Sequence, residues 1–499
     1  MGANNKLRIG DVSENGQITI IDEDRLCYLV KSVSKGAVGL RTISKALLDE
    51  FVVYMRQHPE VPANEVRFKI SGQSDIDKYE YGYGATLSAM ANMVLGRMKV
   101  NHRTAIVSKS ATANLWICSL YRSYITAIKS KPFLLLAGIS GTGKSRIVRE
   151  LAKACWEKGS KEYKDPKPKN FEMVQVKPNW HDSSELIGYV SRVSGSPVFV
   201  AGDFLKFVAK AWENPDVPYF LCLDEMNLAP VEQYFAEYLS VVESRKADEN
   251  GMITTDPILK KSGEDWYRIL TSELTSDENV RNQFLNDGIA IPQNLIVVGT
   301  VNMDETTFSF SRKVLDRAMT FEMNEVDLYG GLDDRHEKIG KLEAGNLIGT
   351  AVEGVDVYRK NKEVCDTALK YLQAVNLNLD GTPFKVAYRT RNEFLLYVVN
   401  NLPYNNDKDG NEIPQNEIIA RALDEITSMK ILSRIEGDET KVSASFLDGL
   451  ENTIKTSLVT VCPNLFEEGE GKKAFVSVSL AKLTEMKKRL TSGYTSFWS

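Results

Sequence analysis

The chain has 499 residues, of which 43% are apolar and 26% charged, and it carries a formal net charge of −5. This is the composition of an ordinary globular protein with room for about two to four domains. No apolar run approaches the length of a membrane span and the start lacks the apolar core of a signal peptide, so a cytoplasmic protein with no membrane partner is expected.

The cysteines and histidines are too scattered to predict a metal centre. Six cysteines and four histidines are spread along the chain, and no C-x-x-C pair occurs. This pattern argues against zinc and against a disulfide framework, and it favours buried or incidental thiols.

Residues 1–110 are predicted to form a separate N-terminal recognition domain of unknown type. Strands are expected over 18–21 and 66–70, and helices over 40–57 and 85–97. Residues 1–130 hold 17 Lys and Arg against 12 Asp and Glu, on an otherwise acidic chain. This balance permits contact with nucleic acid without requiring it, because the densest basic stretch, 97–109, is more typical of a solvated face than of a binding site.

A phosphate-binding loop follows the apolar, strand-like run 131–137. Its pattern G-x-x-x-x-G-K-S comprises Gly138, Ile139, Ser140, Gly141, Thr142, Gly143, Lys144 and Ser145, and a helical pattern over 146–156 follows at once. The glycines let backbone N–H groups converge on phosphate oxygens, and the helix points its positive end at the same anion. We expect Lys144 to reach the β- and γ-phosphates and the Ser145 hydroxyl to bind Mg²⁺. The alternative is an empty glycine turn before a helix.

Two acids end a later apolar strand, over 219–225, in the manner of a Walker B segment. Asp224 is expected to hold Mg²⁺ through water, and Glu225 to polarise the water that attacks the γ-phosphate. The alternative is an ordinary strand end.

A further apolar strand, over 294–302, ends in the polar amide of Asn302. This side chain is placed to orient the attacking water and to sense the γ-phosphate. Arg317 follows at the end of a short helix, where ring-forming ATPases carry an arginine finger that reaches the neighbour's nucleotide. A local salt bridge from Arg317 to Asp316 or Glu322 is the alternative.

From about residue 326 onward the pattern is helical. Helices are expected over 388–399, 418–432, 446–459 and 480–490. Arg389, at the start of the first of these, can touch the γ-phosphate from a helical lid. The earlier segment 246–288 is predicted to be a polar excursion of unassigned role.

Together these features predict an α/β fold built on a P-loop NTPase core. The core, a parallel sheet flanked by helices, is expected over 111–325, and a helical lid with C-terminal helices over 326–499. An α+β N-terminal domain over 1–110 precedes them. The predicted catalytic residues are Glu225, Asn302, Arg317 and Arg389, with Ser145 and Asp224 at Mg²⁺.

The same motifs resemble a AAA+ module, and the chain from about residue 110 resembles the McrB-like branch, the NTPase motors of modification-dependent restriction systems. The residues that carry the resemblance are 138–145, Pro178-Asn179-Trp180, Leu186-Ile187-Gly188-Tyr189, Asp224-Glu225-Met226-Asn227-Leu228-Ala229, Gly299-Thr300-Val301-Asn302-Met303-Asp304-Glu305-Thr306-Thr307, Val314-Leu315-Asp316-Arg317-Ala318, Tyr388-Arg389 and Lys430-Ile431-Leu432. The run after Asn302 is the most specific part.

This resemblance implies a homo-oligomeric ring, expected to be a hexamer, and an N-terminal domain that binds double-stranded DNA. It also implies a separate McrC-like nuclease subunit that stimulates hydrolysis. Family members use GTP, in association with an M-N-x-x-D signature at the sensor strand. Here the run 301–305 has Val301 and Glu305 at the first and last places, so GTP and ATP both remain candidate substrates.

Three functions fit the sequence. The leading one is an NTP-driven motor for DNA recognition or translocation in restriction or phage defence, with cleavage by the separate nuclease. The alternative is a MoxR-like ATPase that remodels protein clients, and a third is an assembly scaffold that hydrolyses poorly. The basic N-terminal domain and the sensor run favour the first, while intact Lys144, Asp224, Glu225 and Asn302 argue against the third.

Overall fold

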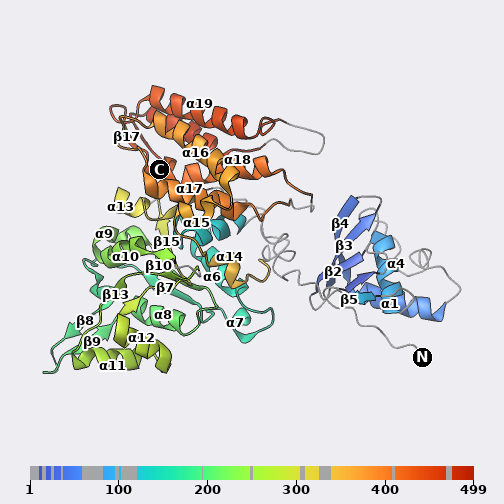
Figure 1. Ribbon diagram of the computed structural model, residues 1–499, viewed down its shortest axis with the longest axis horizontal. Coiled ribbons are helices and arrows are strands. Elements are labelled where there is room, and N and C mark those ends of the chain that lie inside the picture. Colours follow the sequence, from blue (N-terminus) through green and yellow to red (C-terminus); the bar gives the residue numbers. More distant parts are fainter. Residues whose placement is uncertain are drawn as a thin grey trace. The chain divides into compact units, whose positions relative to one another are not determined.

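The computed structural model describes residues 11–13, 18–23, 27–34, 37–58, 83–95, 100–102, 121–193, 195–247, 251–303, 310–324, 339–406, 411–467 and 475–498. They belong to two compact units (Figure 1). The first comprises residues 1–119 with 406–413, and the second comprises 120–405 with 414–499. The predicted strand 66–70, most of the basic stretch 97–109 and the run 304–307 lie outside the described residues.

The first unit contains an antiparallel sheet and two helices. The strand order is β4-β3-β2-β1-β5, with β1 Asp11–Ser13, β2 Ile18–Glu23, β3 Cys27–Ser34, β4 Ala37–Ser44 and β5 Val100–His102. Helices α1 (Lys45–Gln57) and α4 (Tyr83–Val94) pack on each other through fully buried side chains that include Phe51, Met55 and Met90. The predicted strand at 18–21 is confirmed as β2. The predicted helix over 40–57 begins only at Lys45, because the preceding β-branched residues pair with β3.

A five-stranded parallel sheet forms the centre of the second unit. Its order is β16-β6-β15-β10-β7, with β6 Phe133–Gly138, β7 Phe171–Gln175, β10 Tyr219–Asp224, β15 Leu295–Asn302 and β16 Met319–Glu322. The inner strands β6, β15 and β10 are apolar along almost their whole length because helices cover both faces of such a sheet. This confirms the predicted α/β class with a parallel sheet flanked by helices.

The register of the inner strands aligns their carboxyl ends. Asn302 pairs with Gly138 across β15 and β6, and Gly299 pairs with Leu223 across β15 and β10. At the other end of these strands, buried Asn294 donates to the carbonyls of Ala211 (3.0 Å), Asn214 (2.9 Å) and Val217 (2.8 Å) in the chain leading to β10. One amide side chain therefore ties the start of β15 to the start of β10.

Helices and hairpins surround the sheet. They are α6 Lys144–Ala154, α7 Lys161–Lys164, α8 Asp203–Trp212, α9 Val231–Tyr234, α10 Ala236–Val241, α11 Asp265–Leu274, α12 Glu278–Asp287 and α13 Arg312–Leu315, with hairpins β8 (Gly188–Ser191)–β9 (Val198–Ala201), β11 (Lys246–Ala247)–β12 (Ile253–Thr254) and β13 (Pro257–Leu259)–β14 (Ile289–Ala290). Aromatic rings fill the core: Tyr238 lies 5.5 Å from Phe133 and 4.4 Å from Phe235 between ring centroids. The segment 246–288, predicted to be a polar excursion, instead contributes buried Tyr267 and Phe284 to this core.

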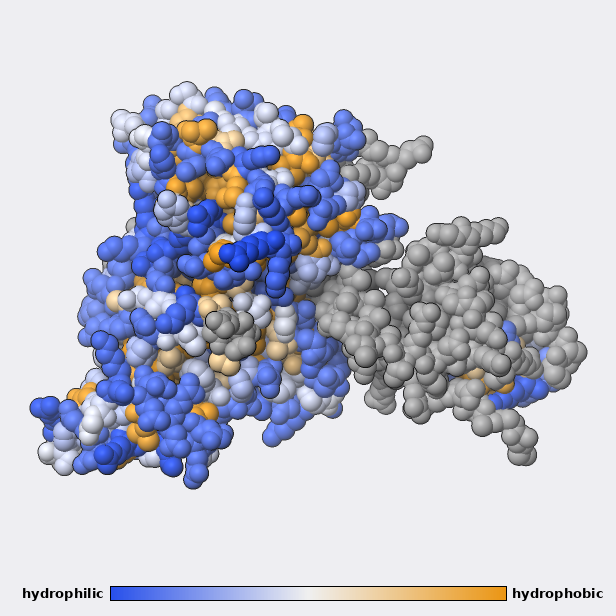
Figure 2. Space-filling view, viewed as in Figure 1, coloured by the Kyte–Doolittle hydropathy of each residue, from blue (hydrophilic) through white to orange (hydrophobic). Residues whose placement is uncertain are grey.

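The remaining part of the second unit is mainly helical, as expected. It contains α14 Ala344–Leu347, α15 Gly354–Tyr358, α16 Lys362–Asn378, α17 Tyr388–Asn401, α18 Gln415–Lys430, α19 Ala444–Val461 and α20 Val478–Leu490. A short antiparallel pair, β17 (Glu436–Asp438) with β18 (Tyr494–Ser496), was not predicted. The face of this unit in Figure 2 is mainly hydrophilic, with hydrophobic residues interspersed, which is normal for a folded surface. Among the helices that the structure describes, none combines the length and apolar character needed to cross a membrane.

Gly299 offers a test of the packing between β15 and the turn after β10. A Cβ at this position would clash with the Met226 sulfur and lie 2.9 Å from Leu135 Cδ2. We expect Gly299→Ala to lower the free energy of unfolding by about 1–3 kcal/mol, as overpacking of a dense core does. Urea unfolding followed by tryptophan fluorescence measures this loss.

The matched control is Gly263→Ala, because no atom lies within 4 Å of a Cβ built there. The control should change the free energy of unfolding by less than about 0.5 kcal/mol. Equal stability of the two variants would contradict the close approach of β15 to Met226.

Candidate nucleotide-binding and hydrolysis site

The predicted phosphate-binding loop leaves the carboxyl end of β6 and enters α6. Gly141 and Gly143 adopt φ angles of 86° and 84°, in the left-handed region that favours glycine. The Thr142 hydroxyl donates to the Ile139 carbonyl at 3.1 Å, which closes the turn. Gly143 precedes α6 and provides no side-chain cap, and the N-terminal end of such a helix favours an anion.

Lys144 and Ser145 are the first two residues of α6. The Lys144 ammonium donates to the carbonyls of Gly138 (2.8 Å) and Ile139 (2.7 Å), and its side chain is buried. This places a positive charge inside the loop, where the helix N-terminus adds to it. Ile139 and Ser140 are exposed, and Ser145 is half-buried.

The loop is also connected to the helical part of the unit. The Ile139 N–H donates to Asn324 Oδ1 at 3.0 Å, and Asn324 Nδ2 donates to Glu322 Oε1 at 2.8 Å. Lys482 of α20 lies 2.5 Å from the same Glu322 oxygen. A chain of polar contacts therefore runs from the phosphate-binding loop, through the end of β16, to a lysine of the C-terminal helix.

The two acids predicted as a Walker B segment meet at one threonine. Thr300 of β15 donates its hydroxyl to Asp224 Oδ1 at 2.7 Å and accepts the Glu225 N–H at 3.1 Å. Asn302, two residues further along β15, donates from Nδ2 to Glu225 Oε1 at 3.1 Å. The structure thus brings Asp224, Glu225 and Asn302 together at the carboxyl edge of the sheet, beside the loop that ends β6.

Glu225 holds a strained backbone. Its φ of 53° and ψ of 51° make it the only non-glycine residue with positive φ in the described part of the chain. This conformation costs about 1–2 kcal/mol for a residue with a Cβ. The next residue is fixed by Tyr234, whose hydroxyl donates to the Met226 carbonyl at 2.8 Å. Burial raises the pKa of Tyr234 well above its usual value, so it remains a donor. Strained backbone conformations of this kind are common at functional sites, where a side chain must be held in one direction.

The donor set at this edge fits a magnesium ion better than a protein-enclosed metal. No cluster of three or more His, Cys, Asp or Glu side chains that could hold a metal occurs among the described residues. Mg²⁺ needs only one or two protein oxygens when phosphates and water complete its shell. Asp224, oriented by Thr300, and the half-buried Ser145 supply oxygens of that type.

Arg317 and Arg389 lie near the amino ends of the strands, at the end of the sheet opposite the phosphate-binding loop. Arg317 precedes β16, whose Met319 pairs with Leu134 near the start of β6, whereas the phosphate-binding loop leaves the end of β6. Arg317 Nη1 donates to the Lys313 carbonyl at 2.7 Å, and its Nε lies 3.6 Å from Glu243 Oε1. The other oxygen of Glu243 forms an ion pair with Arg389 Nη2.

These positions differ from two expectations. The alternative for Arg317 was a salt bridge with Asp316 or Glu322, but Asp316 pairs with Arg434 and Glu322 with Lys482. Arg389 does not lie at the phosphate-binding loop of its own chain, because its ion pair with Glu243 holds it at the amino edge. A contact from Arg389 to a γ-phosphate in the same subunit does not fit this position.

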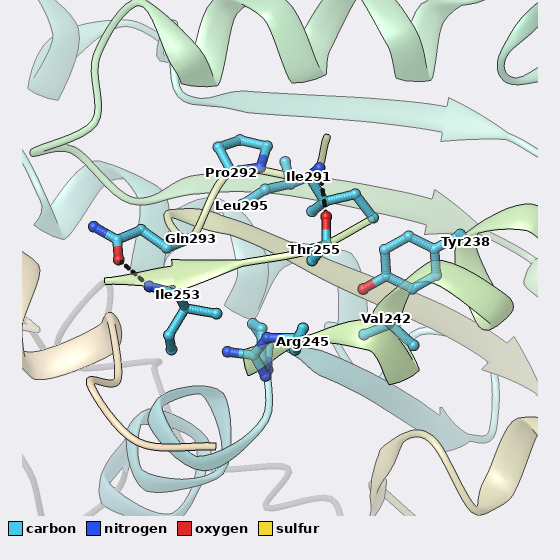
Figure 3. Close-up of a pocket in the computed structure, with 10 residues that line it drawn as sticks. Tyr238, Val242, Arg245, Ile253, Thr255, Ile291, Pro292, Gln293 and Leu295 are labelled. Atoms are coloured by element: carbon cyan, nitrogen blue, oxygen red, sulfur yellow. Dashed lines mark hydrogen bonds between the residues drawn. The ribbon is translucent and has the colours of Figure 1, made fainter. Parts of the chain in front are cut away.

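A narrow pocket lies at the same amino edge, between the starts of β6 and β15 (Figure 3). Its backbone is held by Gln293, which accepts the Ile253 N–H at 3.2 Å, and by Thr255, which accepts the Ile291 N–H at 3.0 Å. Arg245 lines it, and burial lowers the pKa of this guanidinium to about 10. Arg245 therefore stays positive at neutral pH.

Comparison with curated proteins finds a relative that is similar to part of this chain. Residues of this chain are 26% identical over 203 positions to the type IV methyl-directed restriction enzyme EcoKMcrB subunit of Escherichia coli K12. The match covers 41% of this chain and 36% of that protein, so it spans about a third of the relative's length. Together with the loop, acids and amide assembled above, it supports the coarse assignment that the chain carries a AAA+ NTPase core.

Two further similarities concern one sequence family and one solved structure. Residues 348–494 match a sequence family described as a domain of unknown function, DUF8727. A crystal structure of a proposed ATPase from Cytophaga hutchinsonii aligns at a TM-score of 0.34 and 14% identity, covering 64% of this chain and 83% of that one. This similarity is too low to carry an argument.

Sequence reasoning missed four residues of the site. Thr300 carried a signal, as the polar residue inside the apolar strand 294–302. Asn324 follows the last strand of the sheet, but a polar residue after a strand is common. Glu243 and Lys482 could not be found from sequence, because their partners lie far away along the chain.

Thr300 tests the geometry of the acidic pair. We expect Thr300→Val to lower the rate of NTP hydrolysis about 10- to 100-fold, because Asp224 and the Glu225 backbone lose their shared partner. Steady-state phosphate release at saturating Mg²⁺–NTP measures the effect. Thr300→Ser keeps the hydroxyl and should stay within a few-fold of the parent protein. Equal rates for the valine and serine variants would contradict the role of the hydroxyl.

Proposed function

We propose that this protein is an McrB-like AAA+ motor that hydrolyses a nucleoside triphosphate to drive DNA recognition or translocation, together with a separate nuclease subunit. The observation that carries the proposal is the convergence of the Lys144 loop, Glu225 and Asn302 at one edge of the sheet. The local similarity to a restriction-enzyme subunit supports the choice of this branch.

In the proposed hydrolysis, the backbone of residues 138–145 and the Lys144 ammonium bind the β- and γ-phosphates. Lys144 then exchanges its bonds to the Gly138 and Ile139 carbonyls for phosphate oxygens. Ser145 and Asp224 would hold Mg²⁺, which would supply positive charge to neutralise the phosphates.

Glu225 accepts a proton from the attacking water, whose oxygen forms a bond to the γ-phosphorus. The bond from the γ-phosphorus to the β,γ-bridging oxygen breaks, and the products are the nucleoside diphosphate and inorganic phosphate. Asn302 holds the Glu225 carboxylate through Oε1, which directs the other oxygen towards the water.

The hydrolytic site is proposed to be completed by a second copy of the chain. Arg317 lies at the edge of the sheet opposite to the phosphate-binding loop, so a head-to-tail arrangement of copies brings it to the neighbour's nucleotide. Such contacts close into a ring, and a hexamer is the proposed size. The arginine stabilises the charge that develops on the phosphates in the transition state.

Substrate and partners belong to the same proposal. Either GTP or ATP is the nucleotide, and the first unit is the proposed site of double-stranded DNA binding. A McrC-like subunit supplies the nuclease. A MoxR-like role in remodelling protein clients is not favoured, because the local relative is a restriction-enzyme subunit.

The nucleotide and the dependence on DNA are tested together by steady-state hydrolysis of GTP and ATP, each with no DNA, plain duplex or methylated duplex. We expect one nucleotide to be hydrolysed preferentially and the rate to rise with duplex DNA. Hydrolysis of ATP that is indifferent to DNA would contradict the restriction-motor proposal and revive the protein-remodelling alternative.

The completion of the site between copies is tested by mixing two inactive variants. Lys144→Ala should lose nucleotide binding, and Arg317→Ala should keep nucleotide binding but lose hydrolysis. A 1:1 mixture should recover about a quarter of the parent rate, the fraction of interfaces that pair an intact loop with an intact arginine.

Each variant measured alone is the control for this mixture. A mixture that stays as inactive as its components, while both variants still assemble by gel filtration with nucleotide, would contradict action between copies.

A further inference from the structure

Three cations of the second unit converge on the single carboxylate of Glu243. Lys131 Nζ and Arg317 Nε lie 3.7 and 3.6 Å from its Oε1, and Arg389 pairs with its Oε2. Glu243 is half-buried, with 23% of its side chain exposed, so these interactions are only partly screened by water. Glu243 is therefore the common counter-ion of two arginines that come from different parts of the chain.

The two arginines belong to different layers. Arg317 precedes the edge strand β16 of the sheet, whereas Arg389 is in the first turn of α17 in the helical part. Glu243 lies in the short helical turn Val242–Ser244 directly after α10, and the chain reaches α10 from the acidic strand β10 by way of α9. The carboxylate thus connects an arginine of the core to an arginine of the helical lid. It lies on the chain segment that follows Asp224 and Glu225.

Positive charge is in excess at this edge. Lys131 also lies 2.5 Å from Glu393, which in turn lies 2.9 Å from Lys430. Lys430 also interacts with Asp316, which pairs with Arg434 at 3.0 Å, so five cations face three carboxylates. The Arg389 side chain is 41% exposed, so a ligand can reach it from solvent. A cluster with this surplus favours an additional anion.

The anion cannot be a nucleotide on the same chain's loop. The cluster lies at the start of β6 and the loop at its end, which is roughly 16 Å at the rise of a parallel strand. An arginine side chain is too short to bridge that separation. A polyphosphate on an adjacent copy is the anion that the proposed head-to-tail ring would deliver to this edge.

We propose that Glu243 is a positioning residue that holds Arg317 and Arg389 together as a two-guanidinium site for the phosphates of a neighbouring copy's nucleotide. This inference rests on the proposed function, since it requires action between copies. Arg389 is then a second arginine acting across the interface, and the placement of α17 sets the geometry of both guanidinium groups. Removal of the carboxylate charge leaves each arginine free to move apart.

The experiment compares Glu243→Gln with the parent protein in hydrolysis and in nucleotide binding. We expect kcat to fall about 10- to 100-fold, because a displaced catalytic group loses alignment. The dissociation constant for Mg²⁺–nucleotide should stay within about two-fold, since the chain's own loop is remote. The double variant Glu243→Gln/Arg389→Ala should lose little more than either single variant, because coupled residues are non-additive.

Mixing tests the direction of action. Glu243→Gln mixed with Lys144→Ala should recover activity, because the Lys144→Ala copy still supplies an intact arginine pair. The double variant Lys144→Ala/Glu243→Gln should fail to rescue Arg317→Ala. If Glu243 positions arginines for the neighbour's site, the first mixture recovers activity and the second does not. Damage to the subunit's own fold would not produce this difference between the two mixtures.

The controls separate the possible failures. Glu451→Gln makes the same change in an ion cluster with Lys487 on the helical part and should leave kcat unchanged. Glu243→Asp keeps the charge but shortens the side chain. If the Gln variant does not fold, the Asp variant should still show a several-fold loss of kcat. An unchanged or raised kcat in Glu243→Gln, or a loss that Lys144→Ala cannot rescue, would overturn this inference. Failure of the Lys144→Ala and Arg317→Ala mixture would instead overturn the proposed action between copies.

Discussion

The alignment of parallel strands is the constraint on which the candidate site depends. β6, β15 and β10 pair so that Gly138, Asn302 and Asp224 end at the same edge of the sheet. Open α/β sheets bind ligands at this edge, where the strand order reverses between neighbours. In the order here β15 lies between β6 and β10, which places Thr300 and Asn302 of β15 between the loop and the acids. A slip of one residue would turn Thr300 away from Asp224.

A buried ion network gives the opposite edge its geometry. Burial raises the pKa of Glu393, but the charges of Lys131 and Lys430 outweigh it and hold the pKa below its usual value. Burial lowers the pKa of Lys430 to about 8, while its ammonium also donates to the carbonyls of Asp316 and Ala318 at 3.0 and 2.8 Å. Such networks add little net stability but penalise any arrangement that leaves a charge unpaired. They therefore specify how the helical part sits on the sheet, and with it where Arg389 lies.

The sequence was sufficient for the sheet and for the local motifs. The apolar strands, the glycine loop and the acidic pair are short-range patterns whose geometry follows from neighbours in the chain. It was insufficient for strands β1, β3, β4 and β5 of the first unit and for the segment 246–288, where buried Tyr267 and Phe284 are outnumbered by polar neighbours. The position of Arg389 could not be predicted from the sequence either. It depends on Glu243, a partner nearly 150 residues away that only tertiary packing brings close.

We propose that Glu225, held by Thr300 and Asn302, acts on a nucleotide bound at Lys144. Single-turnover hydrolysis and equilibrium nucleotide binding by Glu225→Gln test it most directly. We expect a nucleotide dissociation constant close to that of the parent protein and a hydrolysis rate lower by about 10² or more, because the proton acceptor is lost. Hydrolysis at the parent rate would contradict the assignment of the catalytic base.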